Sequence, residues 1–134
     1  NVEEYLGHGR FAIFYLLCGV AGTWGHMLLN PSSQIPLIGA SGAIAGILGA
    51  YLVLYPRHQV LCLLFLFIIV QMIRLPAIWV LGFWFLIQVF QGTMSLGGSG
   101  SDGVAWFAHV GGFLAGLTLI FLARQFGWHT SRSW

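Results

Sequence analysis

One serine and one histidine in this chain have surroundings suited to nucleophilic catalysis. Ser41 lies in the run Gly39-Ala40-Ser41-Gly42, whose small residues let another chain approach the hydroxyl. A serine hydroxyl is a weak nucleophile unless a base removes its proton, and the neutral imidazole of His109 is the candidate base. If Ser41 begins a helix, the free backbone N–H groups at that helix end, supported by the three small residues around Ser41, could stabilise an oxyanion.

Glycines four residues apart follow both candidate residues. Gly42 and Gly46 follow the serine, and Gly112 and Gly116 follow the histidine. Small residues at this spacing let membrane helices approach closely, so we interpret Gly46, Gly112 and Gly116 as helix-packing positions. Glycine–serine stretches and single histidines are also common in helices that merely pack together. The residues alone therefore leave catalysis and a structural role about equally open.

The composition places these residues in a membrane protein. Hydrophobic residues make up 58% of the chain and charged residues only 6%, whereas a soluble domain carries about a quarter charged residues. So few charges cannot coat a water-facing surface, and lipid must cover the chain instead. The net charge of +2 is too small to indicate nucleic-acid binding. Cys18 and Cys62 lack the spacing of a metal site, and we expect no metal and no cofactor.

Four apolar stretches predict transmembrane helices, which need roughly 20 apolar residues each. They cover residues 11–29, 37–55, 77–91 (a short span) and 106–124. We interpret residues 60–73, which are too few to cross alone, as a re-entrant or interfacial segment; a full crossing by this segment is the alternative. The predicted fold class is an all-α polytopic membrane protein with four transmembrane helices.

The arginines predict the orientation of these helices. Four of them flank spans on one side, which the positive-inside tendency makes cytoplasmic: Arg10, Arg57, Arg124 and Arg132. The loops at 30–36 and 92–104 contain neither Lys nor Arg, so we expect them outside, with both chain ends cytoplasmic. Ser41 and His109 then lie in the first turns of two helices that run in the same direction, at similar depth near the outer face.

Two motifs resemble those of the rhomboid family of intramembrane serine proteases. Residues 39–42 match its glycine–x–serine–glycine motif, and residues 108–116 match its alanine–histidine–x–x–glycine–x–x–x–glycine motif. Residues 2–10 look like the loop before the family's third transmembrane helix. The resemblance covers a partial membrane domain at 1–126 and leaves 127–134 as a polar tail. It implies a rhomboid-like helical bundle that corresponds to helices three to six of a six-helix core and lacks the first two.

The resemblance also implies roles for single residues. Ser41 would be the nucleophile and His109 the general base of a dyad without an acidic third member, so we interpret Asp102 as a loop residue. The family's second helix carries a histidine and an asparagine, four apart, that help form the oxyanion hole; these would precede Asn1. His26 and Asn30 have that spacing but follow the first span, so we expect a polar His26 at the membrane interface and Asn30 at a turn. The loop at 92–104 would be a movable cap.

We therefore predict a rhomboid-type serine endopeptidase that cleaves transmembrane-segment substrates near the outer face of a bacterial inner membrane. Its partners would be transmembrane substrates and the lipid bilayer, with other membrane subunits an open class. The alternative is a catalytically silent rhomboid-fold accessory or binding subunit of a larger membrane complex. A channel or transporter subunit is disfavoured because no span carries a charged residue in its interior. Activity of this chain without the upstream helices is an open point.

Overall fold

Helices and one hairpin make up the protein. The computed structural model describes residues 1–32, 40–66, 69–97 and 104–128. In chain order the elements are α1 (Val2–Leu6), α2 (His8–Leu29), α3 (Ser41–Leu54), β1 (Gln59–Leu66), β2 (Ile69–Pro76), α4 (Ala77–Leu96) and α5 (Trp106–Gln125).

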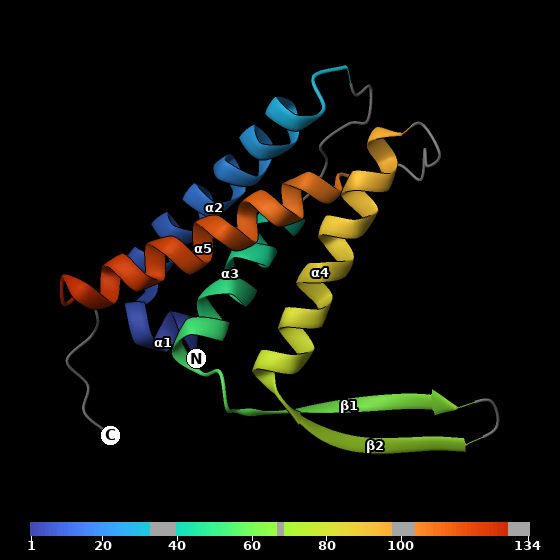
Figure 1. Cartoon of the computed structure of the whole chain (residues 1–134). Helices are drawn as coiled ribbons and strands as arrows, with labels where there is room; N and C mark the ends of the chain where they lie inside the picture. Colours follow the sequence, from blue (N-terminus) through green and yellow to red (C-terminus); the bar gives the residue numbers. More distant parts are fainter. Residues whose placement is uncertain (33–39, 67–68, 98–103, 129–134) are drawn as a thin grey trace.

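The four long helices form a bundle around α5. This helix packs against α2 and α3, and α4 lies along its other side (Figure 1). At one end of the bundle α2 and α4 finish, while α3 and α5 begin (Figure 1). Because α3 and α5 start at the same end, the first turns of these two helices are neighbours.

Three of the described helices are long and apolar enough to cross a membrane, namely α2, α4 and α5. Helix α3 has 14 residues, or about 21 Å at 1.5 Å per residue, which is less than the roughly 30 Å of a hydrocarbon core. The chain is therefore an integral membrane protein, while the count of four spans stays a prediction. The predicted start of the second span, at residue 37, lies outside the described residues.

The N-terminal stretch differs from the loop that we expected. Residues 2–6 form α1, and α2 already begins at His8. Val2 and Leu6 are one helical turn apart and are only 4% and 2% exposed, in a cluster with Cys18 and Ile120. Burial of this apolar pair stabilises the short helix against the bundle. Because Glu3, Glu4 and Tyr5 lie between the two residues, the sequence does not read as an apolar helix.

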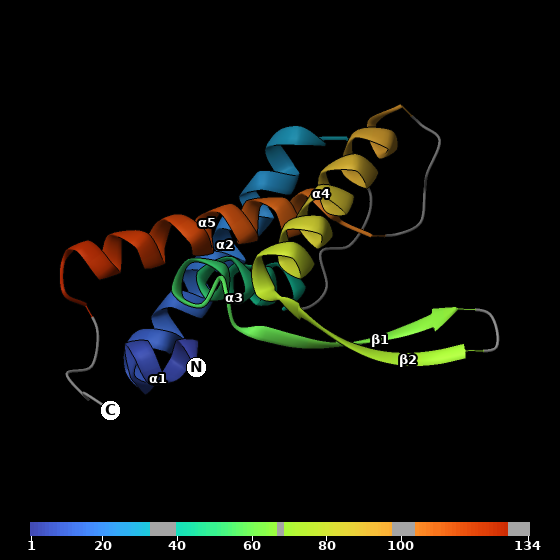
Figure 2. The ribbon, with the colours of Figure 1, turned by 60° about the horizontal axis from the view of Figure 1, so that its bottom comes forward.

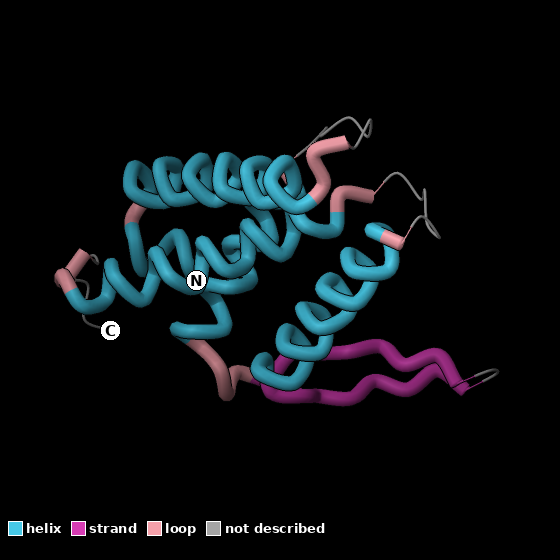
Figure 3. The backbone as a smooth tube through the Cα atoms, turned by 45° about the horizontal axis from the view of Figure 1, so that its top comes forward, coloured by secondary structure: helices cyan, strands magenta, loops and turns pink. Residues whose placement is uncertain are grey.

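The segment after α3 is a β-hairpin, so the all-α prediction is wrong here. Strands β1 and β2 pair antiparallel from Gln59↔Pro76 to Leu66↔Ile69 and extend away from the helices (Figures 2 and 3). Pairing satisfies the backbone groups that face the partner strand, and the hairpin turns back a segment that is too short to cross the membrane as a helix. From 60 to 73 the run is apolar except for Gln71, and such a run does not distinguish a strand from a buried helix.

The hairpin returns the chain to the place where it left the bundle. The N–H of Ala77 donates to the carbonyl of His58 at 2.8 Å, and the N–H of Ile78 donates to the carbonyl of Pro56 at 2.9 Å. Helix α3 therefore ends, and helix α4 begins, at the same end of the bundle. This is expected if the hairpin between them does not cross the membrane.

Helix α4 is longer than the predicted short span at 77–91. It continues to Leu96, because the hydroxyls of Thr93 and Ser95 donate back to the carbonyls of Phe90 and Gly92, each at 2.7 Å. These bonds within the helix let polar residues extend it. The loop that we placed at 92–104 is therefore shorter than predicted, and its residues 98–103 lie outside the described part of the chain.

Candidate functional site

Glycines bring α3 and α5 into direct backbone contact. A Cβ atom added at Gly112 would overlap the carbonyl oxygen of Gly42, and one added at Gly116 would overlap that of Gly46. At the start of α3, a Cβ on Gly42 would lie 3.2 Å from the carbonyl oxygen of Ala108. The two helices therefore touch backbone to backbone at these glycines, as small residues allow in membranes.

This contact places Ser41 and His109 on adjoining turns. Ser41 is the first residue of α3 and precedes Gly42, while His109 follows Ala108 on α5. Ser41 is exposed and His109 is half-buried. The structure shows no hydrogen bond between the Ser41 hydroxyl and the His109 imidazole. The structure therefore brings the backbones at Ser41 and His109 close together without joining their side chains.

The N-terminus of α3 offers backbone donors beside Ser41. The hydrogen-bond ladder of this helix begins with the N–H of Ile44, which donates to the carbonyl of Ala40 at 2.9 Å. The N–H groups of Ser41, Gly42 and Ala43 precede that bond, and Ala40 provides no side-chain cap. A helix N-terminus also carries partial positive charge, so this end can stabilise an oxyanion. Gly39, the other small residue predicted to support it, lies outside the described residues.

The imidazole of His109 is held from α4. Its Nδ1 atom lies 2.7 Å from Oε1 of Gln88, which is 4% exposed. The ring centroid of Trp84 lies 6.0 Å from that of His109, and the ring of Trp106 meets it edge-on at 6.2 Å. The sequence analysis did not single out Gln88. A polar amide within an apolar span was the available signal, since such residues face the protein interior and are often functional.

Neither His26 nor Asn30 is hydrogen-bonded to Ser41 or His109 in the described part of the chain. His26 is 4% exposed and is thus buried among the helices, while its expected depth at the membrane interface stays a prediction. Neither ring nitrogen of His26 has a hydrogen-bond partner in the described structure. Asn30 ends α2 and its N–H donates to the carbonyl of His26 at 2.9 Å, after which the chain turns at Pro31. Asp102 lies outside the described residues.

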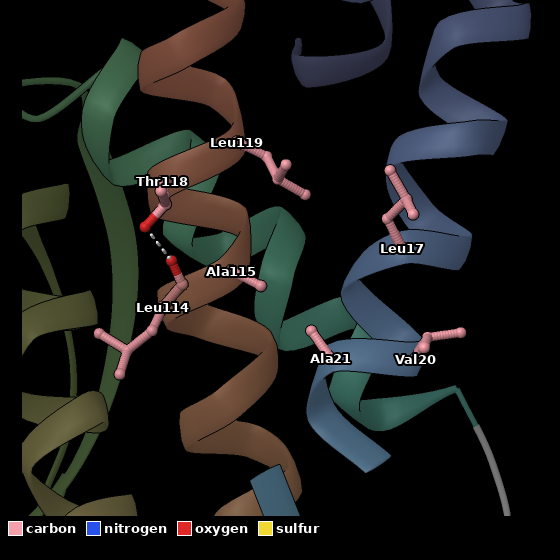
Figure 4. Close-up of a pocket in the computed structure, with 7 residues that line it drawn as sticks. All are labelled: Leu17, Val20, Ala21, Leu114, Ala115, Thr118 and Leu119. Atoms are coloured by element: carbon pink, nitrogen blue, oxygen red, sulfur yellow. Dashed lines mark hydrogen bonds between the residues drawn. The ribbon is translucent and has the colours of Figure 1, made fainter. Parts of the chain in front are cut away.

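A groove between α2 and α5 lies further along the bundle. It has a volume of about 530 Å³, and six of its seven lining residues are apolar (Figure 4). The seventh, Thr118, donates its hydroxyl to the carbonyl of Leu114 at 2.8 Å and is thereby satisfied within its own helix (Figure 4). The groove has no group that could react. Within the described ranges, no group of three or more His, Cys, Asp or Glu could hold a metal ion.

Comparisons with known proteins agree on one family. A family model described as the Rhomboid domain matches residues 1–126. The Rhomboid protease GluP of Bacillus subtilis (strain 168) is 45% identical over 51 residues, a match that covers 38% of this chain and 10% of that protein. No solved structure matches the chain.

Proposed function

The chain belongs to the rhomboid family, and from this premise we propose that it is an intramembrane serine protease in which Ser41 is the nucleophile and His109 the general base. The observation that carries the proposal is the backbone contact of Gly42 with Ala108, the direct neighbours of these two residues. The nucleophile and the base then lie on adjoining turns, and catalytic hydrogen bonds often tighten only when substrate binds.

The proposed reaction runs in two steps. The Ser41 Oγ atom attacks the carbonyl carbon of the scissile peptide bond while His109 takes the hydroxyl proton. The N–H groups at the start of α3 stabilise the oxyanion that forms. Collapse of this intermediate breaks the C–N bond, and His109 gives its proton to the leaving amine. Water then attacks the acyl-enzyme, with His109 again as the base, and releases Ser41 with its proton.

The proposed substrate is a transmembrane segment. The end of the bundle that carries Ser41 would face the outside of a bacterial inner membrane, with both chain ends cytoplasmic. Ser41 is exposed at that end, so water and an unwound substrate can both reach it. The substrate must unwind, because the carbonyl of a helical peptide bond is occupied by the helix's own hydrogen bond.

Labelling with a fluorophosphonate probe, which reacts with activated serines, tests this proposal. We expect the purified protein in detergent to be labelled, and Ser41→Ala and His109→Ala each to abolish labelling. Ser95→Ala and His58→Ala are matched controls and should label like the wild type. The Ser95 hydroxyl is bonded to its own helix, and His58 lies at the opposite end of the bundle.

Two observations favour the second candidate function, a catalytically silent accessory or binding subunit. The Ser41 hydroxyl and the His109 imidazole are not hydrogen-bonded to each other in the structure, and large apolar side chains are exposed on every helix from α2 to α5. A folded wild-type protein that resists the probe would support this second function and contradict the protease proposal.

A further inference from the structure

A buried amide on α4 faces the imidazole that we propose as the base. Gln88 lies in the middle of α4, is 4% exposed, and has both ends of its amide engaged. Its Oε1 atom lies 2.7 Å from Nδ1 of His109, and its Nε2 donates to the carbonyl of Trp84 at 3.4 Å. An amide that is buried and bonded on both sides has a fixed orientation.

These two contacts determine which imidazole nitrogen carries the proton. The carbonyl of Trp84 can only accept a hydrogen bond, so the NH₂ group of Gln88 must face it. The amide oxygen then faces His109, and an oxygen can only accept. The hydrogen bond at 2.7 Å therefore requires a proton on Nδ1 of His109. A neutral imidazole has one such proton, which leaves the lone pair on Nε2.

Aromatic rings hold the same imidazole in place. Trp84 lies one turn before Gln88 on α4, and its ring lies 6.0 Å from the His109 ring. Trp106 lies one turn before His109 on α5 and meets the imidazole edge-on. With the rings beside it and Gln88 bonded to Nδ1, the imidazole has little freedom to flip. Among the described residues, no hydrogen bond is made to Nε2.

We propose that Gln88 is a positioning residue for His109: it fixes the Nδ1–H tautomer and directs the basic Nε2 atom to the Ser41 hydroxyl. This inference rests on the proposed function and adds a third, neutral member to the dyad. An amide suits this place in a membrane because burying an unpaired carboxylate there is far more costly. Gln88 supplies orientation without the negative charge that would stabilise an imidazolium.

The decisive comparison uses three variants, two at Gln88 and one at Gln91 on the same helix. Gln88→Met keeps the length of the side chain and removes the acceptor. We expect the maximal rate of fluorophosphonate labelling to fall roughly 10- to 100-fold, as when other residues that orient a functional histidine are removed. The probe concentration for half-maximal rate should not change. Gln91→Met, on the exposed side of the same helix, should keep the wild-type rate.

Gln88→Glu tests orientation separately from packing. Its carboxylate would be paired with the imidazole, which offsets the cost of burial, so the variant restores an acceptor for Nδ1 and adds a charge that stabilises the imidazolium. We expect the labelling rate at high pH to recover to within a few fold of the wild type, and the acid limb of the pH–rate profile to shift to higher pH. A residue that only packs would give a Glu variant as slow as the Met variant, with no shift of the profile. That result would overturn the proposal.

A direct reading of the tautomer does not depend on activity. In protein labelled with ¹⁵N-histidine, the His109 signals, assigned by their loss in His109→Ala, should show a protonated Nδ1 and an unprotonated Nε2 at neutral pH. A protonated Nε2 would overturn the inference even if Ser41 is labelled. Conversely, a protonated Nδ1 in a protein that resists the probe would support the role of Gln88 while the protease proposal failed.

Discussion

Gly112 on α5 faces the carbonyl oxygen of Gly42 on α3 with no room for a methyl group between them. This contact lies one residue from Ser41 and one turn from His109, so the separation of the two helices sets the distance between the proposed nucleophile and base. Any side chain at position 112 must push the helices apart, because the obstacle is backbone and cannot rotate away.

Gly112→Ala should therefore impair both stability and labelling. Insertion of a carbon into a packed contact costs about 1–3 kcal/mol, and we expect the thermal midpoint in detergent to fall. Probe labelling of the folded fraction should fall at least tenfold. Gly82→Ala is the control, since a Cβ there meets nothing within 4 Å. Equal midpoints for the two variants would show that α3 and α5 are not in backbone contact.

The rate of probe labelling should depend on the protonation of one imidazole. The base must be neutral to accept the Ser41 proton, so we expect labelling to be lost in acid and to rise to a plateau as the imidazole deprotonates. A pH–rate series on wild type and His58→Ala measures this, and both should give the same curve. A rate that does not fall at any acid pH at which the protein stays folded would exclude His109 as the base.

Much of the helical scaffold could be predicted from residue patterns. The apolar stretches gave the positions of α2, α4 and α5, and two short motifs sufficed for the family, which the match over residues 1–126 confirms. The missed features depend on contacts between distant residues. Strand pairing between residues 59 and 76 leaves no clear periodicity in a run that is mostly apolar, and α1 forms because Val2 and Leu6 pack against the bundle.

The role of Gln88 could not be read from spacing for a similar reason. It lies 21 residues before His109 in a different helix, and only the packing of α4 on α5 brings the two side chains together. The sequence shows a polar residue inside an apolar span, which indicates an inward-facing position but does not identify its partner. Ser41 and His109 could be proposed because each lies in a recognisable motif.

The hairpin should lie in contact with lipid. Large apolar side chains are exposed on both of its strands, among them Phe65 at 72% and Met72 at 70%. Such a surface is stable only if membrane or protein covers it. A spin label at Phe65→Cys, in a Cys62→Ala background and in lipid nanodiscs, should be more accessible to oxygen than to a water-soluble nickel complex. If the label at position 65 were as accessible to the nickel complex as a label at Arg57→Cys, an exposed control position, the hairpin would lie in water.

The two ends of the bundle should face opposite sides of the membrane. Ser32 is exposed after α2, at the end that carries Ser41, and Arg57 is exposed between α3 and the hairpin, at the other end. The arginines favour a cytoplasmic location for the second end. Single cysteines at these positions, in the Cys62→Ala background, can be probed in intact cells with a membrane-impermeant maleimide, since Cys18 is fully buried. Ser32→Cys should label before the membrane is permeabilised and Arg57→Cys only afterwards; the reverse order would place Ser41 at the cytoplasmic face and contradict the proposed site of cleavage.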